Sequence, residues 1–125
     1  MSYWLAGEKT PGKSVAATGR RSLRFIITNN SDDGQVTAFR DIHPVAPTHI
    51  LIIPNRHIES VGTLEPADET LVGHIFSVAR NLAEQEGISR GGYRIITKTG
   101  PHDGKTVFHL QVHLIGGKRM RYPMG

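Results

Sequence analysis

Polar side chains recur at every second position of the stretch TVFHLQVHLIGG, residues 106–117. The polar members are His109, Gln111 and His113, and the residues between them are Leu110, Val112 and Leu114. A β-strand points successive side chains to opposite faces, so this spacing predicts a strand over 106–117 with one polar and one aliphatic face. Two imidazoles and an amide on one face indicate a ligand site, because a buried imidazole needs partners for both ring nitrogens. Two hydrogen-bonded structural histidines would produce the same pattern.

Four segments of the chain resemble one known family. The segment HLQVHLIGG (109–117) is similar to the signature of histidine triad (HIT) proteins, His-φ-His-φ-His-φ-φ followed by Gly-Gly, with Gln111 in place of the middle histidine. Three more segments resemble the Hint branch of that family in order and spacing: AFRDIHPVAPTHILIIP (38–54), GYRIITKTG (92–100) and RMRYPMG (119–125). The resemblance covers about residues 33–125 and implies a HIT-like fold that pairs edge to edge into a two-fold homodimer.

The resemblance implies a covalent reaction for which Gln111 is poorly suited. In the family the middle histidine attacks the α-phosphate of a nucleotide conjugate, and water then resolves the nucleotidyl-imidazole intermediate. The lone pair of the Gln111 amide nitrogen is delocalised into the carbonyl, so it cannot take this role. The catalytic positions that the resemblance implies are His49, His109, Gln111 and His113. Here His49 would orient the triad, His109 would hydrogen-bond around the nucleophile and His113 would contact the phosphate, while Gln111 would impair catalysis.

The same resemblance implies a pocket for a purine nucleotide. Asp41 matches a carboxylate that accepts both ribose hydroxyls, and an ionised acceptor suits a vicinal diol. Thr106 matches a hydroxyl that donates to the phosphate or the leaving group. The apolar walls around the base would be Phe39, Ile42 and Leu51. The chain departs from the family at Lys98, where an asparagine is implied, at Lys105, where a Gly-Gly-Gln run would end, and at Tyr122, where a tryptophan is implied.

The leading hypothesis is a purine-nucleotide-binding protein of nucleoside phosphoramidase descent, and the residues leave three alternatives open. An active nucleotidyl hydrolase could use His109 or His113 as its nucleophile. A non-catalytic protein could respond to nucleotide binding and signal to partners. Zinc could bind His49, His109 and His113, since three imidazoles that leave one position open form a catalytic zinc pattern. The sequence reveals no carboxylate to support such ligands, and the resemblance accounts for the histidines without a metal or other cofactor.

Local patterns predict the elements that position these residues. Besides 106–117, the strands expected from β-branched and aromatic runs are 23–28, 35–40, 49–53 and 93–97. The turn-forming NNSDDG at 29–34 should separate the first two strands. A helix is expected over 66–86, because apolar residues recur there at three- and four-residue steps: Leu71, Ile75, Val78, Leu82 and Ala83. Pro66 suits its first turn, Gly87 suits the position after its end, and we assign His74 a structural or surface role. A five-stranded antiparallel sheet and one main helix define an α+β protein.

Length and composition restrict the organisation of the chain. The 125 residues fit one domain, which we place at 23–125 after an atypical, mobile N-terminal arm at 1–22. Within this arm, GEKTPGKS (7–14) matches the phosphate-loop pattern, but no hydrophobic strand precedes it and a poor helix follows it. We therefore assign no phosphate site to the arm.

Charge and hydropathy bear on partners and compartment. The net charge of +4 and the pI near 9.8 suit a nucleotide, whereas the scattered basic residues do not indicate a specific nucleic-acid surface. The absence of cysteine excludes disulfides and thiolate metal sites. No apolar run approaches the roughly 20 residues of a membrane span, and the N-terminus lacks the apolar core of a signal peptide. We expect a cytoplasmic protein without a membrane partner.

Overall fold

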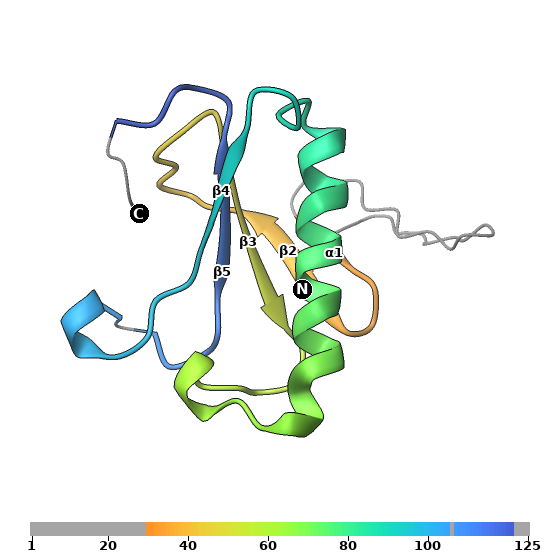
Figure 1. Cartoon of the computed structure of the whole chain (residues 1–125), viewed down its shortest axis with the longest axis vertical. Coiled ribbons are helices and arrows are strands. Elements are labelled where there is room, and N and C mark those ends of the chain that lie inside the picture. Colours follow the sequence, from red (N-terminus) through yellow and green to blue (C-terminus); the bar gives the residue numbers. More distant parts are fainter. Residues whose placement is uncertain (1–29, 106, 122–125) are drawn as a thin grey trace.

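One long helix lies beside one antiparallel sheet in the computed structural model, which describes residues 30–105 and 107–121 (Figure 1). The strands are β1 (Asn30–Asp32), β2 (Val36–Arg40), β3 (Thr48–Pro54), β4 (Tyr93–Ile96) and β5 (Val112–Gly116), and the helix is α1 (Glu69–Gln85). Three short 3-10 helices are η1 (Val61–Thr63), η2 (Pro66–Asp68) and η3 (Pro101–Asp103). The strand order β1-β2-β3-β5-β4 puts β3 and β5 inside the sheet and β1 and β4 at its edges. The α+β class, the antiparallel sheet and the single main helix are confirmed.

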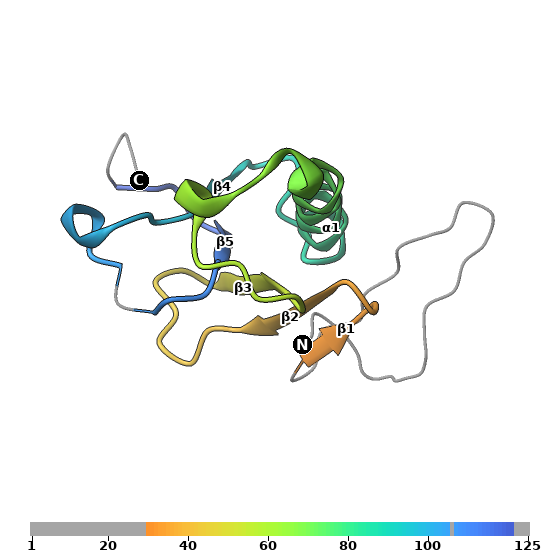
Figure 2. The same ribbon diagram turned by 90° about the horizontal axis from the view of Figure 1, so that it is seen from below.

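Helix α1 packs against one face of the sheet (Figure 2). The core contains alternate residues of the strands together with one stripe of the helix: Val36, Ala38, Ile50, Ile52, Val112, Leu114, Ile75, Val78, Ala79, Leu82 and Ala83. Because side chains alternate along a strand, the positions between these core residues face away from the helix. His49 and Leu51 of β3 and His113 of β5 occupy such positions. The helix-free face therefore carries His49 and His113.

The helix predicted over 66–86 corresponds to η2 followed by α1, so its first turn is a 3-10 helix and its end agrees with the structure to within one residue. Pro66 opens η2, which leads directly into α1, and Gly87 follows the helix with a φ of +75°. The Ile88 N–H donates to the Ala83 carbonyl at 3.0 Å, and the Gly87 N–H donates to the Glu84 carbonyl at 3.1 Å. This pair of bonds is a Schellman motif, which satisfies the last carbonyls of the helix and requires a left-handed residue at Gly87.

His74 connects the helix to the turn between β1 and β2. Its Nε2 lies 2.6 Å from Asp33 Oδ2, and both side chains are largely shielded from solvent. The contact joins the helix to the sheet edge, so of the structural and surface roles expected for His74 the structural one applies.

The first strand lies within the segment predicted to be a turn. Asn30–Asp32 pairs with β2, so the turn prediction for 29–34 is wrong at these residues. The turn is confined to the residues that follow: Asp33 Oδ1 accepts the Val36 N–H at 3.0 Å, and Gly34 has a φ of +92°. Backbone pairing with β2 outweighs the turn propensity of the asparagine and aspartate side chains.

The predicted features before residue 30 lie outside the described residues. They are the arm at 1–22, the phosphate-loop pattern at 7–14 and the strand at 23–28. In the part of the chain that the structure describes, no helix has the length and apolarity needed to cross a membrane.

The histidine-bearing strand is shorter than predicted. Strand β5 begins only at Val112, so the prediction of a strand is wrong for residues 107–111. The backbone there bonds to other partners: Leu110 N–H donates to the Ile58 carbonyl at 2.6 Å, and the Gln111 carbonyl accepts the Thr97 hydroxyl at 2.8 Å. These bonds replace a strand ladder. The aliphatic half of the pattern is correct, because Leu110, Val112 and Leu114 are 2%, 6% and 0% exposed.

Candidate functional site

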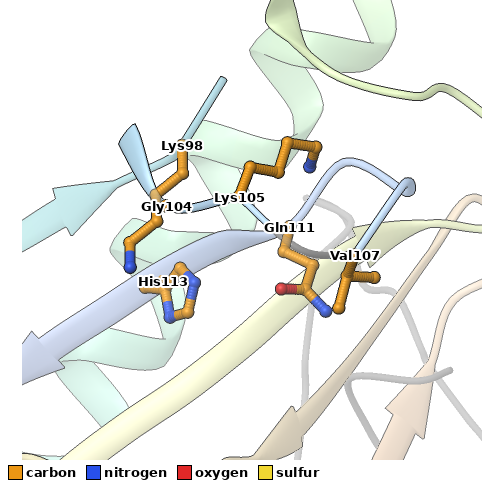
Figure 3. Close-up of a pocket in the computed structure, with 6 residues that line it drawn as sticks. All are labelled: Lys98, Gly104, Lys105, Val107, Gln111 and His113. Carbon is orange, nitrogen blue, oxygen red and sulfur yellow. The ribbon is translucent and has the colours of Figure 1, made fainter. Parts of the chain in front are cut away.

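A cavity of about 110 Å³ lies at the end of the sheet where β4 stops and β5 starts. Its lining residues are Lys98, Gly104, Lys105, Val107, Gln111 and His113 (Figure 3). Lys98 follows β4, Gln111 immediately precedes β5, and His113 is the second residue of β5. The cavity thus brings together two cations, an amide and an imidazole from three segments of the chain.

The two central strands place His49 next to His113. Leu51 of β3 is the register partner of His113, so His49 lies two residues away on the same face. His49 Nε2 and His113 Nδ1 are 3.0 Å apart, and their ring centroids are separated by 5.2 Å. Of the two motif histidines, the one that His49 contacts is His113.

A backbone contact determines which ring nitrogens of this histidine pair carry protons. The Val45 N–H lies 3.2 Å from His49 Nδ1. An amide N–H can only donate, so Nδ1 of the neutral His49 ring is the acceptor and its proton resides on Nε2. That proton is then donated to Nδ1 of His113, which leaves the proton of the neutral His113 ring on Nε2. His113 can therefore donate a hydrogen bond through Nε2 but has no free lone pair there.

Both imidazoles favour the neutral form. Burial lowers the pKa of His49 and outweighs the charge of Asp41, which acts in the opposite direction. Burial also lowers the pKa of His113, and the neighbouring His49, Lys98 and Lys105 add to the effect against the attraction of Asp41. Desolvation and nearby positive charge both penalise an imidazolium, so the hydrogen-bond chain is that of two neutral rings near pH 7.

The His109 side chain does not lie on the polar face that it was predicted to share with Gln111 and His113. Its Nε2 lies 3.0 Å from the Pro54 carbonyl, which can only accept, so the ring donates to β3. The ring also contacts His57 edge to face, with centroids 5.1 Å apart. His109 does not line the cavity with Gln111 and His113. The prediction of one shared face is wrong for His109, because residues 107–111 lack the strand geometry that would have produced it.

The residues predicted to hold the nucleoside come from the helix-free face of the sheet and from the loop after β2. Phe39 and Leu51 are register partners on β2 and β3, and Leu51 is in turn the partner of His113, so the three form a row across the sheet. Asp41 follows β2, and its Oδ1 accepts the His43 N–H at 2.8 Å. Ile42 is 85% exposed in the adjoining loop. Thr106 and Tyr122 lie outside the described residues.

A metal-ligand set differs from the predicted trio of imidazoles. Among the described residues, the group with ligand atoms within 4.8 Å of one another is Asp41, His49 and His113, so the zinc set was wrong in including His109. Asp41 Oδ2 lies 3.4 Å from His49 Nε2 and is the carboxylate that the sequence did not reveal. A metal on Nε2 would displace its proton and leave Nδ1 facing the Val45 N–H, which demands an imidazolate. The donor set thus favours a hydrogen-bonded pair.

Several contributors to the site were missed from the sequence. Val45 acts through its backbone N–H, which leaves no trace in side-chain type. Thr97 anchors the Gln111 carbonyl through its hydroxyl, and its position one residue before Lys98 was the only available signal. Val107 lies at an alternate position from Gln111 and His113 and lines the cavity with them, but its apolar side chain gave no signal of a site. Gly104 lines the cavity from the connection before β5 and has no side chain that could have indicated a role.

Comparisons with known proteins identify the family of this chain. The model of the HIT domain family matches residues 25–120. The purine nucleoside phosphoramidase of Escherichia coli strain K12 is 51% identical over 86 residues, which cover 69% of this chain and 72% of that protein. The crystal structure of a HIT family hydrolase from Legionella pneumophila superposes with a TM-score of 0.73 at 41% identity, covering 75% of this chain and 84% of the other. A HIT family hydrolase from Clostridium thermocellum superposes with a TM-score of 0.70 at 43% identity, covering 73% of this chain and 79% of the other. The chain therefore belongs to the HIT domain family.

Proposed function

We propose that this chain is a purine-nucleotide-binding HIT protein of nucleoside phosphoramidase descent whose covalent catalysis is impaired by Gln111. The observation that carries the proposal is the position of Gln111 in the cavity beside His113 and Lys98. This is the middle position of the motif, where the family resemblance implies the nucleophile. A carboxamide can hydrogen-bond a phosphate oxygen, but it cannot form a nucleotidyl-imidazole.

Neither of the other motif histidines is well placed to replace the missing nucleophile. His113 presents an N–H to the cavity, because its Nδ1 accepts from His49. His109 donates from Nε2 to the Pro54 carbonyl and lies outside the cavity lining. An active nucleotidyl hydrolase that uses either ring would first need to rearrange these hydrogen bonds. Binding without efficient turnover is the function that this arrangement supports best.

The nucleoside would lie along the row that leads away from the cavity. Phe39 is half-buried and would offer apolar surface to a purine, with the buried Leu51 beside it, and Asp41 would provide an ionised acceptor for the ribose hydroxyls. His113 would donate its Nε2–H to the α-phosphate. We expect a purine monophosphate to bind with a dissociation constant in the micromolar to millimolar range, which corresponds to roughly −4 to −8 kcal/mol.

The reversion Gln111→His tests the catalytic half of the proposal, with Gln111→Asn as a matched control that remains a carboxamide. Turnover of adenosine phosphoramidate should be negligible for the native chain and for Gln111→Asn. It should become measurable in the revertant, because loss of a nucleophile costs several orders of magnitude in rate. Acid quenching and mass spectrometry should detect a nucleotidyl adduct in the revertant alone. An adduct on His109 or His113 of the native chain would refute the proposal and establish the active hydrolase.

Calorimetry tests the binding half. The native chain, Gln111→His and Gln111→Asn should bind adenosine monophosphate with similar affinity, and Asp41→Ala should weaken binding in each background. Absence of heat with purine monophosphates at millimolar concentration would refute the pocket assignment.

We also infer a two-fold homodimer that pairs through the edge of the sheet. Strand β4 is an edge strand, and unpaired edge groups favour pairing with another chain. Sedimentation at tens of micromolar protein should give the mass of a dimer, and a monomer at that concentration would contradict the inference.

A further inference from the structure

We propose that the cavity beside His113 is a subsite for a second phosphate group, so that this chain prefers a purine nucleoside diphosphate or a longer polyphosphate over a monophosphate. The inference rests on the proposed nucleotide function and adds the class of ligand. Two lysines carry it: Lys98 and Lys105 both line the cavity.

The two lysines bring positive charge that no described carboxylate neutralises. Over residues 30–105 and 107–121, the ion pairs involve arginine and histidine, and none includes Lys98 or Lys105. Lys105 Nζ donates to the His109 carbonyl at 3.2 Å, which orients the ammonium group without compensating its charge. The electrostatic influence of both lysines reaches His113. An anion of matching charge would remove this unfavourable concentration of like charge.

The side chains divide the cavity into two donor groups (Figure 3). Lys98 extends toward the His113 ring, so its ammonium group and the His113 Nε2–H can contact one phosphate together. Lys105 extends toward the segment that carries Val107 and bonds there to the His109 carbonyl. A lysine ammonium sits on a flexible stem with three rotatable donors, so Lys105 can turn to a second phosphate while its backbone stays in place.

The size of the cavity fits phosphate groups better than a whole nucleotide. Its volume of about 110 Å³ is far below the roughly 300–1,000 Å³ of pockets that enclose drug-sized ligands. The purine and ribose would remain outside it, along Phe39, Leu51 and Asp41.

Charge matching then separates the candidate ligands. A phosphoramidate monoester bears one negative charge, and a phosphate monoester bears about 1.5 to 2 near pH 7. Either could be compensated by Lys98 with the His113 donor, which would leave Lys105 without a counter-charge. A diphosphate supplies further anionic oxygens for Lys105, and hydrogen bonds between charged groups are roughly twice as strong as neutral ones.

Calorimetric titration with adenosine monophosphate and adenosine diphosphate tests the inference. Magnesium is omitted and a chelator is added, so that no cation accompanies the diphosphate. We expect the native chain to bind the diphosphate about tenfold more tightly than the monophosphate at low salt, and we expect that ratio to fall as added salt screens the charges. Inorganic pyrophosphate should displace the monophosphate more effectively than inorganic phosphate does.

Variants identify the groups responsible. Lys105→Gln should reduce the ratio toward one. Lys98→Asn should weaken both nucleotides, because Lys98 contacts the phosphate that they share, and Arg90→Gln should leave the ratio unchanged. Arg90 is a suitable control because it is exposed and lies before β4, at the opposite end of that strand from Lys98. Its substitution by glutamine changes the net charge by the same amount as each lysine substitution. Asp41→Ala should weaken both nucleotides to a similar extent and preserve the ratio. Thermal unfolding of each variant verifies that it is folded.

The outcomes separate this inference from the function on which it rests. A native chain that binds both nucleotides with equal affinity would overturn the second phosphate subsite and leave the nucleotide function intact. A preference for the diphosphate that survives Lys105→Gln would overturn the role of the cavity. Absence of binding to either nucleotide would overturn both the subsite and the proposed function.

Discussion

Protonation of the His49–His113 pair should make the stability of this protein depend on pH. Both groups have a lowered pKa in the folded chain, chiefly because burial disfavours the imidazolium. In the unfolded chain each returns to about 6.5. Between the folded and the unfolded pKa the unfolded state binds more protons, so stability rises with pH in that interval. The contribution is fully present above about pH 6.5 and is lost as the pH falls through the folded pKa values.

The size of the effect has an upper limit set by the number of protons. Each histidine can change the free energy of unfolding by at most about 1.4 kcal/mol per pH unit, so the pair can contribute at most about 2.7 kcal/mol per pH unit. The slope should fall short of this limit, because solvent still reaches the His113 ring and screens its interactions. His113→Asn removes one titrating group and keeps a carbonyl oxygen that can accept the His49 Nε2–H. We expect it to remove up to about 1.4 kcal/mol per pH unit of the slope.

Urea unfolding in steps from about pH 5 to about pH 7.5 measures this slope, in a range that lies above the ordinary carboxyl pKa values of about 4. His102→Asn is a matched control, since it removes an exposed imidazole from η3. The reasoning is refuted if stability increases as the pH falls from 6.5, or if His113→Asn and His102→Asn have the same slope as the native chain.

Three further substitutions probe the scaffold through urea unfolding. Leu114→Ala should destabilise the protein by about 2–5 kcal/mol, because the side chain is fully buried between the sheet and α1, and a loss below about 1 kcal/mol would contradict that packing. Gly87→Ala should cost about 1–2 kcal/mol, since alanine at a φ of +75° is strained. Gly73→Ala should instead stabilise by about 0.5–1 kcal/mol, because this glycine is within α1 and a new Cβ there meets no atom within 4 Å. Equal effects of the two glycine substitutions would disprove the assignment of the helix end.

The amino-acid sequence by itself determined the parts of the fold that depend on local periodicity. Leu110, Val112 and Leu114 were assigned to the core from their alternation, and they are buried even though regular strand geometry starts only at Val112. The end of α1 was predicted from Gly87, because a residue with positive φ is required there and glycine adopts it without strain. In both cases the cause lies within a few residues of the effect.

The sequence also indicated which residues gather at the site but not how they are connected. Gln111, His113, Lys98 and Lys105 were all predicted as site residues, and all four line one cavity. Lys98 and Lys105 were assigned to the site from the resemblance to the family, because no periodic pattern includes them. Whether they bind a nucleotide stays a prediction that the experiments above test.

Only the tertiary structure decided where each polar group finds its partner. His109 was expected beside His113, yet its Nε2–H donates a hydrogen bond to the Pro54 carbonyl of β3. The backbone N–H of Val45 determines which ring nitrogen of neutral His49 carries the proton. Through the hydrogen bond between the two rings, it also determines that His113 carries its proton on Nε2. Side-chain alternation fixes which face of a strand a residue occupies. The donor or acceptor that it meets on that face comes from segments far away in the chain, and only their packing determines it.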